Sequence, residues 1–188
     1  MPPFAPASTA LILIDLQHGI AERMELAPRT GAEVVERAKV LAASFRAAGA
    51  PVVLVHVGFT PETMPSQTVD KPALPAGGTP PEFQELVEGL RQPGDTVVLK
   101  RHWGAFTGTD LDLTLRRRGV KTVVIAGIAT NFGVESTARS AWEHSYDVII
   151  VEDVCTSRSA ELHRFAIDNI LPAISRVTTA DAIGFDAG

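Results

Sequence analysis

Cysteine is almost absent from this sequence: Cys155 is the only one in 188 residues, so no disulfide can form within the chain. Positive charge is also scarce, with 17 Lys and Arg against 22 Asp and Glu and a formal net charge of −5. Nucleic-acid and anionic-membrane surfaces need clustered positive charge, so neither partner is expected. Hydrophobic runs near 10–14, 52–57 and 123–128 stay well below the roughly 18–20 residues of a membrane span. No basic region precedes an apolar run at Met1, so we expect no secretory signal and a cytoplasmic location.

The composition and the pattern of apolar residues predict one α/β domain over residues 1–188. Apolar residues make up 45% of the chain and charged residues 21%, close to the average of folded domains. Apolar, β-branched runs without polar alternation predict strands that are buried on both faces of a sheet, at 10–15, 52–57, 96–100, 122–127, 148–151 and 174–178. Helical spacing and capping residues predict helices between them, at 31–48, 109–119, 133–144 and 159–171. The alternation predicts a doubly wound, mostly parallel six-stranded sheet with helices on both faces.

Residues 58–81 interrupt this alternation. The segment is rich in proline, contains Gly77-Gly78 and shows no apolar period. A loop of this length in a compact domain usually serves as a lid, a binding loop or a subunit contact. We therefore expect one of these roles for it.

Polar residues follow the predicted strands at what would be one edge of the sheet, where open parallel sheets bind ligands. Asp15 ends the first strand and Lys100 ends the third, and residues 130–133 join the fourth strand to its helix. Asp15 suits a general acid or base, and a facing Lys100 would orient the carboxylate and favour its charged form. A helix-capping aspartate and a lysine that reaches the surface are the alternative interpretations.

Other side chains near this edge are candidates for the wall of a pocket: Gln17, His56, Trp103, Phe106, Thr130, Asn131 and Phe132. Core packing would explain the aromatic candidates equally well, and a structural hydrogen bond would explain His56. The histidines show no metal-ligand spacing, and no glycine-rich phosphate-binding motif occurs, so neither a metal nor a cofactor is expected.

Four further residues receive structural interpretations. Cys155 is expected after the fifth strand as a buried structural thiol, because nothing near it in the sequence would lower its pKa. His163 falls within the last predicted long helix and is interpreted as an ordinary helix residue. Glu135 and Arg139 are four residues apart on a predicted helix, which favours a helical ion pair.

Three separated motifs resemble the isochorismatase-like superfamily, which also contains the cysteine hydrolases. They are Asp15 after an apolar strand, Lys100 within LKRHWGAFTGTDL at 99–111, and GIATNFGVESTAR at 127–139. The resemblance covers residues 8–180 with the motifs in the family order. It implies a three-layer, Rossmann-like hydrolase that acts on a small molecule and assembles as a homodimer or homotetramer.

The resemblance also implies roles for individual residues. In the amidase members an Asp–Lys–Cys triad performs catalysis, and the position of the cysteine falls on Gly133, which has no thiol. Glycine at this position is similar to the true isochorismatases, where the aspartate that matches Asp15 protonates a vinyl ether without a covalent intermediate. The family further implies a cis peptide between Ile128 and Ala129. The N–H groups of Ala129 and Gly133 would form an oxyanion hole.

Two interpretations follow. The first is a hydrolase that lacks the cysteine nucleophile and uses Asp15 and Lys100 on a small anionic metabolite such as the vinyl ether of isochorismate. The second is a catalytically silent member that binds a metabolite or serves as a subunit, and the absence of a nucleophilic thiol agrees with it.

The first interpretation meets one physical objection. A general acid must be protonated, whereas a neighbouring Lys100 lowers the pKa of Asp15 unless burial offsets it.

Overall fold

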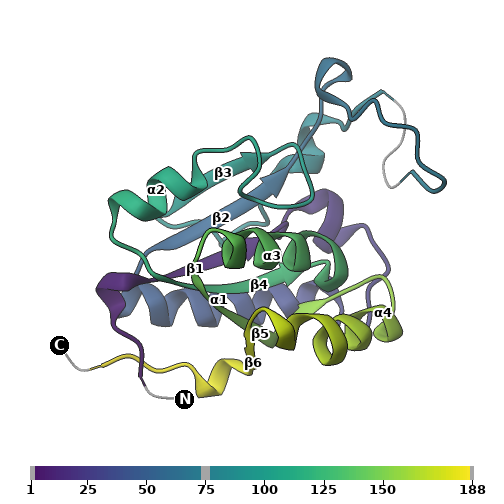
Figure 1. The fold of residues 1–188 in the computed structure, drawn as a ribbon. Coiled ribbons are helices and arrows are strands. Elements are labelled where there is room, and N and C mark those ends of the chain that lie inside the picture. The colour runs from purple at the N-terminus through teal and green to yellow at the C-terminus, as the bar shows by residue number, and fades with distance from the viewer. Residues whose placement is uncertain (1–2, 73–76, 187–188) are drawn as a thin grey trace.

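The computed structural model describes residues 3–72 and 77–186, and a parallel sheet of six strands forms its centre (Figure 1). The strands are β1 (Thr9–Ile14), β2 (Val52–Val57), β3 (Thr96–Lys100), β4 (Thr122–Ile128), β5 (Asp147–Thr156) and β6 (Arg176–Thr178). Their order across the sheet is β3-β2-β1-β4-β5-β6, and every neighbouring pair is parallel. The strand order changes direction between β1 and β4, so ligands are expected beyond the carboxyl ends of these two strands. The predicted doubly wound sheet is confirmed.

Helices cover both faces of the sheet, as right-handed crossovers in opposite directions require (Figure 1). They are α1 (Gly31–Ala47), α2 (Leu111–Arg117), α3 (Glu135–Glu143) and α4 (Ala160–Phe165). The first helix begins at Thr30, whose hydroxyl accepts the N–H of Glu33 while the Glu33 carboxylate accepts the N–H of Thr30. This reciprocal cap satisfies two N–H groups that a helix start otherwise leaves free. No helix among the described residues is long and apolar enough to cross a membrane.

The fifth strand is longer than the predicted 148–151, and Cys155 lies inside it rather than after it. Glu152 and Asp153 interrupt the apolar run, which is why the sequence pattern stops there. The pairing of β4 with β5 shifts register at the same place and resumes with Gly127 opposite Cys155. A bulge of this kind lets a strand continue through a polar interruption.

Three helix boundaries also differ from expectation. Asp110, not Thr109, occupies the N-cap position of α2, but its side chain makes no capping hydrogen bond. The Thr109 hydroxyl accepts the Leu111 N–H at 3.2 Å and donates to the Ala105 carbonyl at 2.6 Å. A π-helical turn at Thr130–Val134 precedes α3. The helix predicted at 159–171 consists of α4, a π turn and a 3-10 turn in succession.

The described part of the 58–81 segment extends away from the sheet (Figure 1). It contains a 3-10 turn at Pro61–Thr63, while residues 73–76 lie outside the described residues. Its role as a lid, a binding loop or a subunit contact stays a prediction.

Candidate active site

Asp15 and Lys100 form a buried ion pair at the carboxyl edge of the sheet. The Nζ of Lys100 lies 2.9 Å from Oδ2 of Asp15, and their side chains are only 1% and 7% exposed. Asp15 follows the last residue of β1 and Lys100 ends β3, so the lysine reaches the carboxylate past the intervening β2. Lys100 also donates to the His102 carbonyl at 3.2 Å. The prediction that Lys100 faces Asp15 is confirmed.

The backbone and side chain of Asp15 are both unusual. Its φ of +54° lies in the left-handed region, which aspartate enters more readily than most residues, and its N–H donates to the Val55 carbonyl at 2.8 Å. The second carboxylate oxygen, Oδ1, is buried and has no hydrogen-bond partner among the described residues. Buried polar atoms almost always have a partner, so Oδ1 is a place where a ligand would bind.

Burial raises the pKa of Asp15 above its ordinary value, and the positive charges of Lys100 and His56 only partly oppose this effect. The carboxyl pays a desolvation cost when it is ionised, and here that cost exceeds the attraction of the lysine. Burial thus favours the protonated form that a general acid needs, while the adjacent Lys100 favours the charged form.

Gly133 lies directly beside the ion pair. A Cβ placed on this glycine would be 3.2 Å from Oδ2 of Asp15 and 2.9 Å from Cγ2 of Ile14. The residue belongs to the π turn that precedes α3, and its carbonyl accepts the hydroxyl of Thr137 at 2.6 Å. The position that the resemblance matched to a nucleophile thus adjoins Asp15, and even a methyl group there would press on Ile14 and the carboxylate.

We predict that Gly133→Ala lowers activity by about 10- to 100-fold, because the methyl group would push the Asp15 carboxylate from its position. Overpacking against Ile14 should also lower the free energy of unfolding by about 1–3 kcal/mol. Steady-state kinetics and urea denaturation of the purified variant measure both effects. Full activity in the variant would contradict the placement of Gly133 in the site.

The peptide between Ile128 and Ala129 is cis, as the resemblance implied. The carbonyl of Ala129 accepts the N–H groups of Phe132 at 3.0 Å and Val134 at 3.2 Å, which closes the turn. The role of the Ala129 and Gly133 N–H groups as an oxyanion hole stays a prediction.

Two pocket candidates are occupied by structural hydrogen bonds. The amide nitrogen of Gln17 donates to the carbonyls of Val57 at 2.8 Å and Phe83 at 2.7 Å, and its oxygen accepts the Val57 N–H at 2.7 Å. Both amide hydrogens are used, so this side chain has a structural role, and its place in a pocket wall stays a prediction. His56 lies near Asp15, and its Nδ1 donates to the Gln84 carbonyl at 2.6 Å, the structural role that was the alternative.

The aromatic candidates separate into two places. The rings of Trp103 and Phe132 pack with their centroids 4.9 Å apart, and Phe132 directly precedes Gly133 in the chain. The Arg158 guanidinium lies 5.9 Å from the centroid of the Phe132 ring. Phe106 instead packs on His144 and Tyr146, which precede β5 at the amino edge of the sheet. Phe106 as a pocket wall is therefore wrong, because the chain has already turned back toward α2.

Thr130, Asn131 and His163 form hydrogen bonds that the sequence did not suggest. The hydroxyl of Thr130 lies 2.8 Å from Nδ1 of His163, and the side-chain oxygen of Asn131 accepts the hydroxyl of Ser157. Interpreting His163 as an ordinary helix residue was wrong, since it is 1% exposed. The helical spacing from His163 to the buried Ile167 was the pattern that places it on the inner face.

Burial and the neighbouring cations Arg29 and Arg164 lower the pKa of His163 from 6.5 to about 4, with Asp168 opposing them. The unfolded chain therefore binds more protons between these values, so this stabilisation is complete above pH 6.5 and is lost as the pH falls toward 4. We predict that the free energy of unfolding falls by about 2 kcal/mol more between pH 7 and pH 5 than it does in His163→Asn. Urea denaturation of both proteins across this range measures the difference, and parallel pH curves would contradict it.

Cys155 is a buried structural thiol, as predicted, and burial raises its pKa to about 12. Its strand position is two strands away from Ile14 in the sheet register, with Gly127 between them. The predicted ion pair between Glu135 and Arg139 is present at 2.9 Å. No group of three or more His, Cys, Asp or Glu side chains in the described part of the chain is arranged to hold a metal ion.

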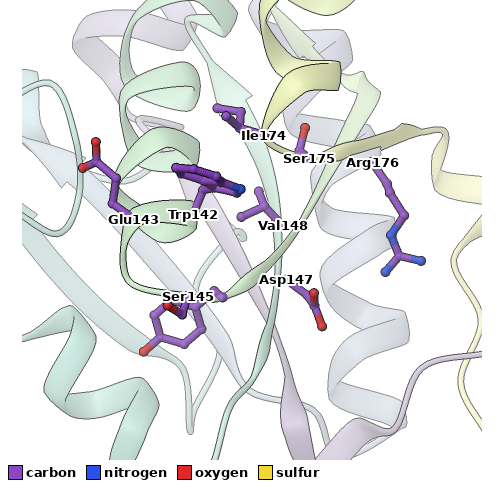
Figure 2. A pocket seen from close by; sticks show the side chains of 9 residues that line it. Trp142, Glu143, Ser145, Asp147, Val148, Ile174, Ser175 and Arg176 are labelled. Atoms are coloured by element: carbon purple, nitrogen blue, oxygen red, sulfur yellow. The ribbon is translucent and has the colours of Figure 1, made fainter.

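A cavity of about 700 Å³ lies at the opposite end of the sheet, between the end of α3 and the starts of β5 and β6 (Figure 2). Figure 2 shows Trp142, Val148 and Ile174 gathered there, with Asp147 and Arg176 nearby. Parallel sheets bind substrates at their carboxyl edge, and this cavity is at the amino edge. It is therefore not the candidate active site.

Comparison with known proteins shows the family of the chain. The isochorismatase domain family matches residues 9–182. The chain is 48% identical to the uncharacterized isochorismatase family protein YecD of Escherichia coli O157:H7, over 94% of each chain. It is 35% identical to the ureidoacrylate amidohydrolase RutB of Methylobacterium radiotolerans, over 88% of this chain and 74% of that protein. The structure of an isochorismatase family protein from Burkholderia thailandensis superposes with a TM-score of 0.90 at 42% identity, over 96% of each chain. The chain belongs to the isochorismatase family of hydrolases.

Proposed function

We propose that this hydrolase cleaves a small anionic metabolite without a covalent intermediate, with Asp15 as the general acid. One observation carries the proposal: a buried, partly unpartnered carboxyl with a raised pKa lies beside Gly133, the position that the resemblance matches to the nucleophile. The vinyl ether of isochorismate is the substrate that suits this chemistry. The hydrolase domain would span residues 1–188.

In this mechanism Asp15 gives its proton to the methylene carbon of the enol ether. The resulting oxocarbenium ion adds water, and the hemiketal collapses to pyruvate and the ring alcohol. Lys100, held 2.9 Å away, stabilises the carboxylate that the proton transfer leaves behind. The substrate would contact the unpartnered Oδ1 of Asp15.

Amidases form an acyl-enzyme through a nucleophilic side chain, and Gly133 offers none at the matching position. Glycine has no side chain to attack a carbonyl, and Cys155 is buried in β5 with its pKa raised to about 12. A thiol reacts as the thiolate, which is nearly absent at neutral pH when the pKa is this high. The amidohydrolase activity named for RutB therefore does not transfer directly to this chain.

The test is pyruvate release from isochorismate, followed through coupled lactate dehydrogenase, with Asp15→Ala as the control. Pyruvate formed by the unmodified protein alone would support the vinyl-ether mechanism. No pyruvate at high enzyme concentration would reject isochorismate as the substrate. Binding of the same molecule without turnover would favour the catalytically silent alternative.

We also propose a homodimer or homotetramer in the cytoplasm. A single cysteine suits a reducing compartment. Size-exclusion chromatography with light scattering tests the assembly, and a particle of 20.0 kDa, the mass of one chain, would contradict it.

A further inference from the structure

Thr130 and His163 form a buried polar pair that the catalytic mechanism does not use. Thr130 is 0% and His163 1% exposed, and Oγ1 of the threonine lies 2.8 Å from Nδ1 of the histidine. The threonine hydroxyl also donates to the Thr156 carbonyl at 3.0 Å. A hydroxyl has only one proton, and a carbonyl oxygen can only accept. The hydrogen in the Thr130–His163 bond therefore belongs to Nδ1 of His163, which fixes the tautomer of the imidazole.

The bonds of this pair continue into neighbouring elements. The hydroxyl of Thr156 donates to the Arg29 carbonyl at 2.6 Å and accepts the Arg29 N–H at 3.2 Å. The adjacent Ser157 donates its hydroxyl to Asn131. The first two residues of the π turn are thus tied to the end of β5 and, through His163, to α4.

The π turn is the segment that places Gly133 beside Asp15. It begins at Thr130, three residues before Gly133, and a Cβ on Gly133 would lie only 3.2 Å from the carboxylate. A displacement of about 1 Å at a reacting group can cost 100-fold in rate. Whatever fixes the start of this turn therefore sets the position of Gly133 relative to the Asp15 carboxyl.

We infer that His163 is a positioning residue: its Nδ1–H donates to the Thr130 hydroxyl, which fixes the π turn and thereby the position of Gly133 against the Asp15 carboxyl. This role rests on the proposed function of Asp15. His163 acts through the turn and not on the substrate, since its bond is to Thr130, the first residue of the turn. The histidine acts as a neutral donor, and the cations Arg29 and Arg164 beside it oppose its protonation.

Matched variants separate positioning from simple stabilisation. His163→Leu and Thr130→Val remove the hydrogen bond, whereas His163→Asn places an amide N–H near the position of Nδ1 and Thr130→Ser keeps the hydroxyl. We expect the first two to lower kcat for isochorismate cleavage by about 10- to 100-fold with KM nearly unchanged. The double variant should lose no more than the larger single loss, because both changes break one interaction. The two conservative variants should recover most of the rate.

A second measurement does not depend on activity. In amide NMR spectra, His163→Leu and Thr130→Val should both shift the Gly133 and Ala129 signals, and His163→Asn should restore them. His144→Leu, a histidine change at the amino edge of the sheet, is the control and should leave these signals in place. If no isochorismate is cleaved, these shifts still show whether His163 holds the turn. Unchanged Gly133 signals in folded His163→Leu, or a lower stability with normal kcat, would overturn the inference.

Discussion

Asp15→Asn is expected to lower kcat/KM by about 10³-fold, the largest effect of any single change, because the amide has no acidic proton to transfer. Asparagine has nearly the same shape and keeps the side chain beside Lys100, so the loss measures chemistry more than packing. Pyruvate release gives the rate, and thermal unfolding shows whether the variant is folded.

Asp95→Asn is the matched control for this change. Asp95 also forms an ion pair, partly buried, with Arg46 at 2.7 Å, and it lies outside the candidate site. The Asp95→Asn variant should have a lower free energy of unfolding than the wild type, while each folded molecule keeps its activity. If Asp15→Asn retained the wild-type rate, Asp15 would not be the acid.

The pH profile of the same reaction reports the charge state of the acid. The rate should fall as the pH rises through the pKa of Asp15, because only the protonated form donates. Burial places that pKa above the ordinary 3.8, so the fall should come at higher pH than for an exposed aspartate. The descending limb should vanish in Asp15→Asn, where only residual activity is left.

Lys100→Met is the second change with a large expected effect. It removes the cation and leaves the Asp15 carboxyl buried with no opposite charge in contact. Removing one partner of a buried pair costs about 3–5 kcal/mol when the other stays charged. We expect this loss in the free energy of unfolding at pH 8, together with a descending pH limb that moves to higher pH.

The sign of the pH dependence distinguishes this effect from simple loss of packing. Without the lysine, the folded protein holds the proton of Asp15 more tightly than the unfolded chain does. The folded state then binds more protons, so its stability falls as the pH rises above about 4 and through the raised pKa. The loss in Lys100→Met should therefore be smaller at pH 5 than at pH 8 in urea denaturation. An equal loss at both pH values would mean that Asp15 is neutral throughout or is not coupled to the lysine.

The pairing of Asp15 with Lys100 was predictable from sequence because parallel strands bring their carboxyl ends to one edge. Asp15 and Lys100 each follow or end an apolar run, so the strand pattern alone places them at that edge. The balance between burial and charge at Asp15 was not predictable, since it depends on how completely the surrounding atoms exclude water.

Other residues show why proximity in sequence misleads. Phe106 is six residues from Lys100 but packs at the opposite edge, because the loop after β3 returns toward α2. Gln17 is two residues from Asp15, but both hydrogens of its side-chain amide are bonded to the carbonyls of Val57 and Phe83. Whether a polar side chain is free for a ligand depends on backbone atoms distant in sequence, which no local pattern reports.

The strand that carries Lys100 lies at the border of the sheet. β3 pairs with β2 on one side, and the strand order ends there. Border strands open locally more easily than central ones, at a free-energy cost below that of global unfolding. Each such opening would withdraw the lysine and leave Asp15 without its cation while the centre of the sheet stayed folded. The lifetime of the Asp15–Lys100 pair is then limited by local opening of β3. Amide hydrogen exchange at Val98 and Lys100 would measure how often that opening occurs.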